Sequence, residues 1–128
     1  FRGDDGLDEI TLATTTSVLT IGGGEISSAL IDPLDFNIQR APIAALVGGD
    51  STENARITTA IFAGEKGAPR DAVVLNAAAA IAAYEARFDL NLHNRMALGI
   101  SRAVDAIDSG AATRLVKQWA ELTQKSGA

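Results

Sequence analysis

The sequence contains no cysteine. This absence excludes a disulfide scaffold, a thiolate metal cluster and a cysteine nucleophile. A chain without thiols suits a reducing compartment, and we therefore expect a cytoplasmic protein.

Positive charge and long apolar runs are also scarce. There are 11 Lys and Arg residues against 16 Asp and Glu residues, which gives a formal net charge of −5. Binding to nucleic-acid phosphates needs a basic patch, so we expect no nucleic-acid partner. The longest apolar stretch, near residues 72–84, contains Asn76 and is too short to cross a bilayer, so we expect no membrane partner.

Histidine is almost absent as well. His93 is the single histidine, and it lies between a leucine and an asparagine with no serine partner or second metal ligand near it in the sequence. This setting favours an exposed side chain over a catalytic one.

The residues that are present predict one domain with strands first and helices afterwards. The chain has 128 residues, of which 47% are hydrophobic, enough for one core. Residues 12–31 are rich in threonine, valine and isoleucine and contain three glycines at 22–24, which predicts a β-hairpin with a glycine turn that ends before Pro33. This order indicates an α+β fold for a complete chain, or part of a larger α/β sheet for an incomplete one.

Four helices are expected after residue 50. Asp50 is the expected N-cap of the first, which Gly64 ends, and the second begins near Pro69. The third covers 92–110 and the fourth 112–124. The second helix is apolar on nearly all faces and is expected to be buried.

Three polar or aromatic side chains within these helices are interpreted structurally. Asn76 is an amide inside an apolar helix, and we expect it to bind the backbone of a neighbouring loop. Tyr84 and Trp119 are expected to be core or interface aromatics. The stretch "VGGDST" at 47–52 resembles a phosphate-binding glycine loop, but Asp50 would occupy the helix amides and repel phosphate.

An acidic run near the start of the chain is the candidate functional site. The stretch "DDGLDEI" at 4–10 places Asp4, Asp5, Asp8 and Glu9 within six positions. Magnesium is typically held by one or two carboxylates together with water and substrate phosphates, and Gly6 would permit the backbone to bend so that neighbouring acids serve one ion. Composition alone instead favours a solvated loop rim.

Five stretches in register resemble the anthranilate phosphoribosyltransferase family. They are "GDDGLDE" at 3–9, "DPLDFNI" at 32–38, "GGDSTENARI" at 48–57, "GAPRDAVVLNAAAAI" at 67–81 and "AIDSGAA" at 106–112. The resemblance implies transfer of a phosphoribosyl group from 5-phosphoribosyl 1-diphosphate to anthranilate, with Mg²⁺ as cofactor. By the same resemblance, Asp8 and Glu9 are the metal ligands.

The resemblance also implies which part of the family fold is present. Residues 1–128 correspond to the C-terminal portion of the catalytic domain, an α/β domain of the nucleoside phosphorylase and phosphoribosyltransferase type. Diphosphate and anthranilate contacts are expected upstream of Phe1, with no catalytic residue in these 128 positions. The N-terminal helical domain, through which family members form homodimers, is expected upstream too. The 128-residue polypeptide alone is therefore expected to be inactive.

The sequence departs from the family pattern at three places. Arg2 stands where many relatives have histidine, and Asn37 stands where glycine is usual in "DFG". Asparagine tolerates left-handed backbone angles, so we expect that turn to survive. The segment 85–99 is longer than in many relatives and is expected to be surface variation.

Two alternatives to the enzyme remain at this point. A non-catalytic relative could bind nucleic acid, although its surface should then be basic. An oligomerising module could instead depend on the C-terminal helices and make no use of the acidic run.

Overall fold

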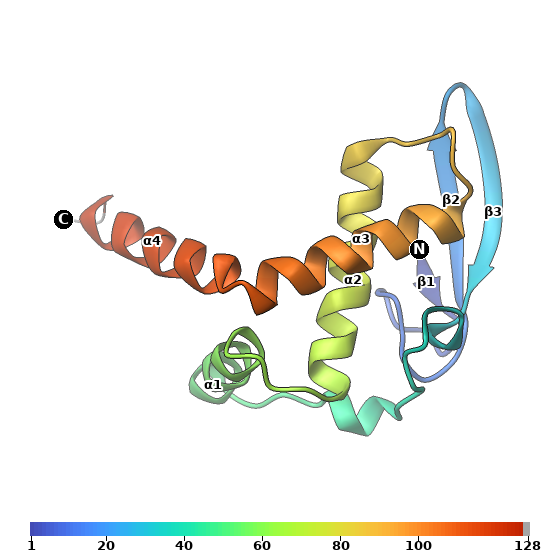
Figure 1. The fold of residues 1–128 in the computed structure, drawn as a ribbon. Helices are drawn as coiled ribbons and strands as arrows, with labels where there is room; N and C mark the ends of the chain where they lie inside the picture. Colours follow the sequence, from blue (N-terminus) through green and yellow to red (C-terminus); the bar gives the residue numbers. More distant parts are fainter. Residues whose placement is uncertain (127–128) are drawn as a thin grey trace.

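The structure is a computed structural model that describes residues 1–126. A short three-stranded antiparallel sheet comes first, with β1 (Arg2–Gly3), β2 (Thr16–Gly22) and β3 (Glu25–Ile31) in that spatial order. Four α-helices follow, α1 (Ser51–Phe62), α2 (Ala68–Glu85), α3 (Leu92–Asp108) and α4 (Ala111–Ser126). Figure 1 shows the hairpin on one side of the helices, and the predicted hairpin and four helices are confirmed.

The hairpin turn is made by two glycines. Thr16 pairs with Ile31 and Gly22 pairs with Glu25, so only Gly23 and Gly24 connect the strands. Both have positive φ angles, 60° and 83°, which a two-residue turn that matches the strand twist requires. The predicted glycine turn is therefore confirmed.

Capping residues define the helix ends much as predicted. The Asp50 side chain accepts a hydrogen bond from the Glu53 backbone N–H at 2.9 Å at the start of α1. Pro69 lies in the first turn of α2. Asn91 caps α3 by accepting from the Asn94 N–H at 2.8 Å. Gly64, with φ 95°, follows the end of α1.

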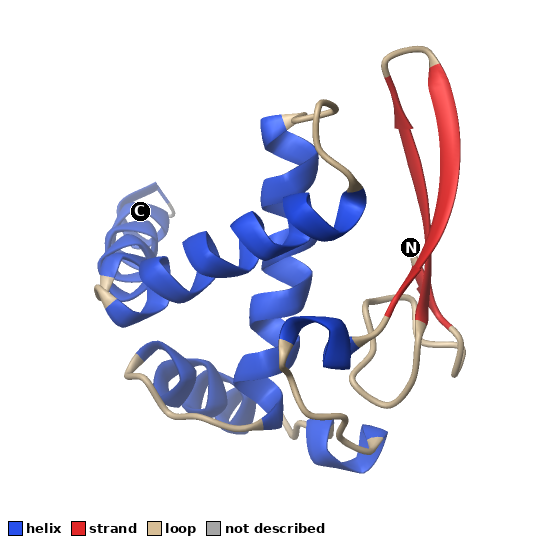
Figure 2. Ribbon diagram, turned by 45° about the vertical axis from the view of Figure 1, so that its right-hand side comes forward, coloured by secondary structure: helices blue, strands red, loops and turns tan. Residues whose placement is uncertain are grey.

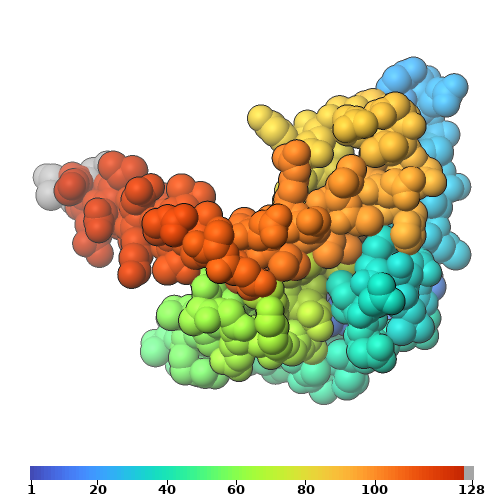
Figure 3. All heavy atoms as spheres, viewed as in Figure 1, coloured from blue at the N-terminus to red at the C-terminus, as the bar shows by residue number. Residues whose placement is uncertain are grey.

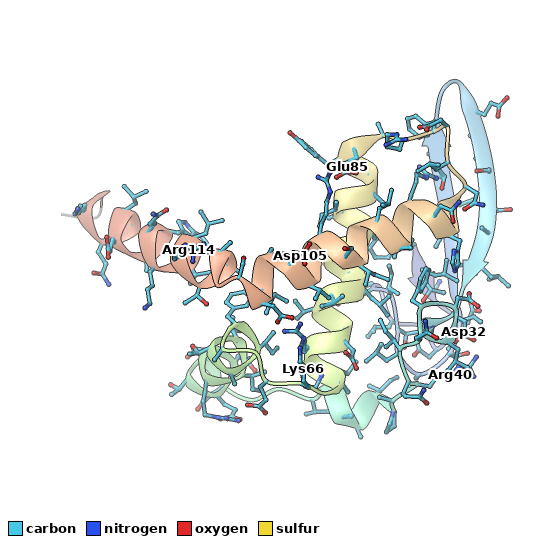
Figure 4. The ribbon with its side chains drawn as sticks, viewed as in Figure 1. Asp32, Arg40, Lys66, Glu85, Asp105 and Arg114 are labelled. Atoms are coloured by element: carbon cyan, nitrogen blue, oxygen red, sulfur yellow. The ribbon has the colours of Figure 1, made fainter. Side chains whose placement is uncertain are left out.

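Two short 3₁₀ helices, η1 (Pro33–Phe36) and η2 (Ile43–Leu46), connect the hairpin to α1. Asp32 caps η1 and also binds Arg40, whose Nε donates to Asp32 Oδ1 at 3.2 Å (Figure 4). The Arg40 hydrogen bond lowers the pKa of Asp32. Asn37 has φ 58°, so the expected left-handed turn is present at this departure from the family pattern.

The core lies where α3 crosses α2 and where the hairpin base meets α2 (Figure 2). Gly99 of α3 allows this crossing, because a Cβ atom there would lie 2.4 Å from the Ala78 carbonyl oxygen. The main buried cluster lies between the hairpin base and these two helices, and a second lies among α1, α2 and α3. Their members are Ile10, Leu12, Ile31, Leu75, Ala78, Ala82 and Met96 in the first, and Ile61, Val74, Ala103 and Ile107 in the second.

The structure decides between the alternatives for two aromatics and overturns one expectation in the C-terminal half. Tyr84 is 91% exposed and Trp119 is 68% exposed, so neither packs in the core of residues 1–126, and their role as interface aromatics stays a prediction. Figure 3 shows the reason for Trp119, because most of α4 extends away from the other helices. The segment 85–99 is also more than surface variation, since its second half begins α3 and buries Met96 and Gly99.

Candidate functional site

The acidic run forms a compact loop between β1 and the buried segment that begins at Ile10. The Gly3 N–H donates to the Leu7 carbonyl and the Gly6 N–H donates to the Gly3 carbonyl, both at 2.9 Å. Gly6 has φ 95°, which glycine adopts without strain. The backbone bends again at Asp8 and Glu9, as the magnesium interpretation requires of adjacent ligands.

The first two acids of the run are bound to the loop's own residues. Asp4 accepts from the hydroxyls of Thr15 and of Ser17, the latter at 3.0 Å. Asp5 accepts from the Thr11 hydroxyl at 2.6 Å and from the Leu7 N–H at 3.1 Å. The Thr11 hydrogen bond, followed by the Leu7 one, lowers the pKa of Asp5, which is therefore a carboxylate at neutral pH. These two acids stabilise the loop.

The next two acids differ sharply from them. Asp8 and Glu9 are exposed, and neither forms a hydrogen bond or an ion pair with any side chain or backbone group of residues 1–126. The loop therefore presents two adjacent carboxylates whose lone pairs are available to an external ligand.

A side chain from α2 fixes the backbone directly after these acids. Asn76 Oδ1 accepts from the Ile10 N–H at 3.0 Å, and Asn76 Nδ2 donates to the Ile10 carbonyl at 3.0 Å. The Ile10 side chain is 2% exposed, and Thr11 and Leu12 are fully buried. The expected link from Asn76 to a loop backbone is confirmed, and the loop is the acidic one. Asn76 thus positions Glu9 through the adjacent peptide.

Asp8 and Glu9 border a hollow of about 480 Å³. Its other walls come from η2 and the residues that follow it, from α1, and from the first half of α2, with Leu46, Ile57 and Ala72 among them. The walls are largely apolar, and within residues 1–126 no group of three or more His, Cys, Asp or Glu side chains could hold a metal ion. Two carboxylates without further protein ligands fit Mg²⁺, which retains waters and takes the rest of its shell from phosphates.

The other residues singled out from the sequence have structural contacts. The glycine loop at 47–52 is closed by Asn54, which accepts from the Gly49 N–H and donates to the Gly49 carbonyl, both at 2.9 Å. With Asp50 capping α1, this loop's interpretation as structural is supported. His93 is exposed, stacks on Phe36 at 4.8 Å between ring centroids, and has Nε2 3.1 Å from the Asp35 carbonyl oxygen.

Two features of the structure have no counterpart in the sequence predictions. The sequence predictions do not include hydroxyl groups that donate hydrogen bonds to Asp4 and Asp5. The threonine-rich stretch after the acids is the sequence feature that could have indicated these donors. Arg70 is 4% exposed and binds Asp108 Oδ1 through Nη2 at 2.9 Å, which ties the start of α2 to the end of α3. Lys66, labelled in Figure 4, lies 3.5 Å from the other oxygen of the same carboxylate.

Comparison with known proteins agrees with the motifs. A family model described as "Glycosyl transferase family, a/b domain" matches residues 1–113. An anthranilate phosphoribosyltransferase of Rhodococcus jostii is 48% identical over 122 residues, covering 95% of this chain and 34% of the relative. One from a Nocardioides species is 45% identical over 125 residues, covering 98% and 36%. The chain therefore spans about a third of the length of these relatives, and they confirm the resemblance seen in the motifs.

Solved structures agree as well. An anthranilate phosphoribosyltransferase variant from Saccharomyces cerevisiae, described with Mg bound, matches with a TM-score of 0.72 and 24% identity over 88% of this chain and 32% of that one. The same yeast enzyme in complex with 4-fluoroanthranilate gives a TM-score of 0.73. At this identity the likeness shows the fold alone, and it confirms that the hairpin and helices match part of a larger α/β fold.

No helix within residues 1–126 has both the length and the apolar character to cross a membrane.

Proposed function

The chain belongs to the glycosyl transferase family, in its α/β domain, and from this premise we propose that it carries the magnesium-binding loop of an anthranilate phosphoribosyltransferase. The full-length enzyme would transfer the phosphoribosyl group of 5-phosphoribosyl 1-diphosphate to the amine of anthranilate, in the pathway to tryptophan. The curated relatives named above, at 48% and 45% identity, support this reaction.

One observation carries the proposal for the loop. Of its four acids, Asp4 and Asp5 are bound to hydroxyls of the same loop region, whereas Asp8 and Glu9 are exposed and without partners among the described residues. Adjacent unpaired carboxylates repel each other, so a bound cation would stabilise them together. Asn76 holds the Ile10 peptide in place, which reduces the conformational freedom that these ligands would lose on binding.

Bound there, Mg²⁺ would neutralise negative charge on the departing diphosphate. Asp8 and Glu9 would hold the ion at the loop, and Asp4 and Asp5 would keep the loop in shape through their hydroxyl partners. Without the cation, the same two acids would repel the sugar diphosphate. Catalytic groups, the anthranilate contacts and the homodimer interface are proposed to lie in the rest of the full-length protein, which we propose to be cytoplasmic.

The test uses the full-length protein and conservative amide variants. Asp8→Asn combined with Glu9→Gln should abolish the magnesium-dependent part of sugar diphosphate binding measured by calorimetry, with an unchanged circular dichroism spectrum. Glu25→Gln combined with Glu121→Gln is the matched control, because both acids are exposed, lie outside the loop, and together remove the same two negative charges. Wild-type affinity in the double variant at saturating Mg²⁺ would refute the proposed role of the loop.

A second candidate, an oligomerising module, is supported by α4. Leu115 and Trp119 are 66% and 68% exposed on this projecting helix. In that case the Asp8 and Glu9 variants would leave every measured property unchanged, whereas Trp119→Ser would change the mass measured by sedimentation.

A further inference from the structure

A buried arginine lies beside the hairpin without a counter-ion. Arg95 of α3 is 8% exposed, and no carboxylate of residues 1–126 forms an ion pair with it. Its Nη2 is 3.4 Å from the Thr20 hydroxyl, a long contact, and its buried Nε has no hydrogen-bond partner among the described residues. Burying a charge without a partner is unfavourable, so this guanidinium is suited to receive an anion.

Arg95 also lines a cavity of about 310 Å³ between the hairpin and helices α2 and α3. Figures 1 and 2 show the strands standing beside the C-terminal half of α2 and the start of α3. Three residues of the wall lie on α2, Ala79, Ala82 and Ala83, and each has only a methyl group as its side chain. The remaining lining is almost entirely apolar, with Thr20 and Arg95 as its polar members. Small-molecule sites typically have this size and this combination of an apolar wall with a few polar groups.

An aromatic ring that also lines the cavity packs on the guanidinium. The ring centroid of Phe88 lies 5.4 Å from the Arg95 guanidinium carbon, within the range of a cation–π contact. The same ring lies against the backbone of Gly22, where an added Cβ atom would meet it at 2.1 Å. The absence of a side chain at Gly22 therefore permits the position of Phe88, and Phe88 in turn packs on Arg95.

We propose that this cavity binds a small carboxylate with a short apolar body. The carboxylate pairs with the Arg95 guanidinium, whose planar array of N–H donors matches two carboxylate oxygens. The apolar body lies against the alanine methyls of α2. This site is separate from the acidic loop, which would repel a carboxylate, and it requires neither Mg²⁺ nor a sugar diphosphate.

Calorimetry on the full-length protein without Mg²⁺ tests this proposal, with hexanoate as the probe. Acetate lacks the apolar body and hexanol lacks the charge, so both should bind far more weakly than hexanoate. Arg95→Met should weaken hexanoate binding by about tenfold to a hundredfold, the usual value of a hydrogen bond to a charged group. Arg56→Met removes the same charge from an exposed position on α1, where the side chain is 65% exposed, and should leave hexanoate binding unchanged.

Further variants separate the site from its surroundings. Gly22→Ala should also weaken hexanoate binding, because the methyl group displaces the Phe88 ring that packs on Arg95. Asp8→Asn with Glu9→Gln should not change hexanoate binding. The proposals for the acidic loop and for this cavity can therefore fail independently of each other. Equal hexanoate affinity in wild type, Arg95→Met and Arg56→Met would overturn the proposal.

Thermal unfolding tests the alternative that the Arg95 charge stabilises the fold and binds no ligand. Replacing an unpaired buried cation with an apolar side chain of similar length should keep or raise Tm. If hexanoate does not bind and Arg95→Met lowers Tm, an acidic side chain elsewhere in the full-length protein is the partner of Arg95, and the proposal is wrong.

Discussion

Asn76 offers the sharpest test of how the helices position the acidic loop. Asn76→Ala removes the acceptor of the Ile10 N–H and the donor to the Ile10 carbonyl, each now 3.0 Å away. A buried backbone group left without a partner costs ~1–3 kcal/mol. Both groups are part-buried, so some water can reach them, and we expect the free energy of unfolding to fall by about 2–4 kcal/mol.

The chain contains a matched control for this substitution. Asn54 makes the same pair of hydrogen bonds to one peptide, at Gly49, with both distances at 2.9 Å. These hydrogen bonds of Asn54 are exposed, so water replaces the lost partners. Asn54→Ala should therefore lower the free energy of unfolding by about 1 kcal/mol or less. Urea unfolding of the two variants in the full-length protein measures the difference. Equal losses in the free energy of unfolding would refute the argument that burial at Ile10 makes the two Asn76 hydrogen bonds more stabilising than those of Asn54.

The same variant has a second consequence for binding. Asn76→Ala leaves Asp8 and Glu9 in place but frees the peptide that follows them. Loss of a group that positions metal ligands typically weakens metal affinity by about tenfold to a hundredfold. We expect such a loss in magnesium-dependent sugar diphosphate binding for Asn76→Ala and none for Asn54→Ala, measured by calorimetry under conditions where both variants are folded. Lower stability with unchanged binding would show that Asn76 has no positioning role.

Three further outcomes follow from the structure. Gly99→Ala should lower the free energy of unfolding by about 1–3 kcal/mol, because overpacking at a helix crossing is destabilising and the new Cβ would meet the Ala78 carbonyl oxygen at 2.4 Å. An unchanged urea midpoint would contradict this. The pKa of Asp5 is lower in the folded state than the usual value of about 3.9 in an unfolded chain, so its carboxylate stabilises the fold above that value. This contribution is lost as the pH falls through the folded-state pKa. Thr11→Val removes the main cause of the lowered pKa, and the free energy of unfolding should then fall less steeply with decreasing pH in the acid range. A 128-residue polypeptide should show no phosphoribosyl transfer in an activity assay, and turnover comparable to that of the full-length enzyme would refute the proposed placement of the catalytic groups upstream.

Local features of the fold could be read from the sequence because local interactions produce them. A capping carboxylate at Asp50, a proline in the first turn of α2 and paired glycines in the hairpin act over a few residues, and each was predicted at its observed place. The position of α4 was not predictable in this way. Trp119 was expected to pack in the core or at an interface, but the sequence of a helix does not say whether its partner lies in the same chain, and Trp119 is exposed here.

The candidate site likewise has features that the sequence predicts and features that it does not. The acidic run and the family likeness were visible in the residues, and an amide within an apolar helix had to find backbone partners. The sequence alone did not distinguish Asp4 and Asp5 from Asp8 and Glu9 by their contacts. That distinction depends on which hydroxyls the turn brings within hydrogen-bond distance.

The sequence by itself therefore determined the hairpin, the order of the four α-helices with most of their caps, and the presence of a carboxylate-rich loop, since all three depend on neighbouring residues; β1 and the two 3₁₀ helices came from the structure alone. Only the tertiary structure decided which carboxylates remain available, which loop Asn76 holds and that Arg95 is buried beside the hairpin. The residues concerned are far apart along the chain, since Asn76 and Ile10 are separated by 66 positions and Arg95 and Thr20 by 75. Packing alone brings them together, and so decides which charges are satisfied and which can bind a ligand.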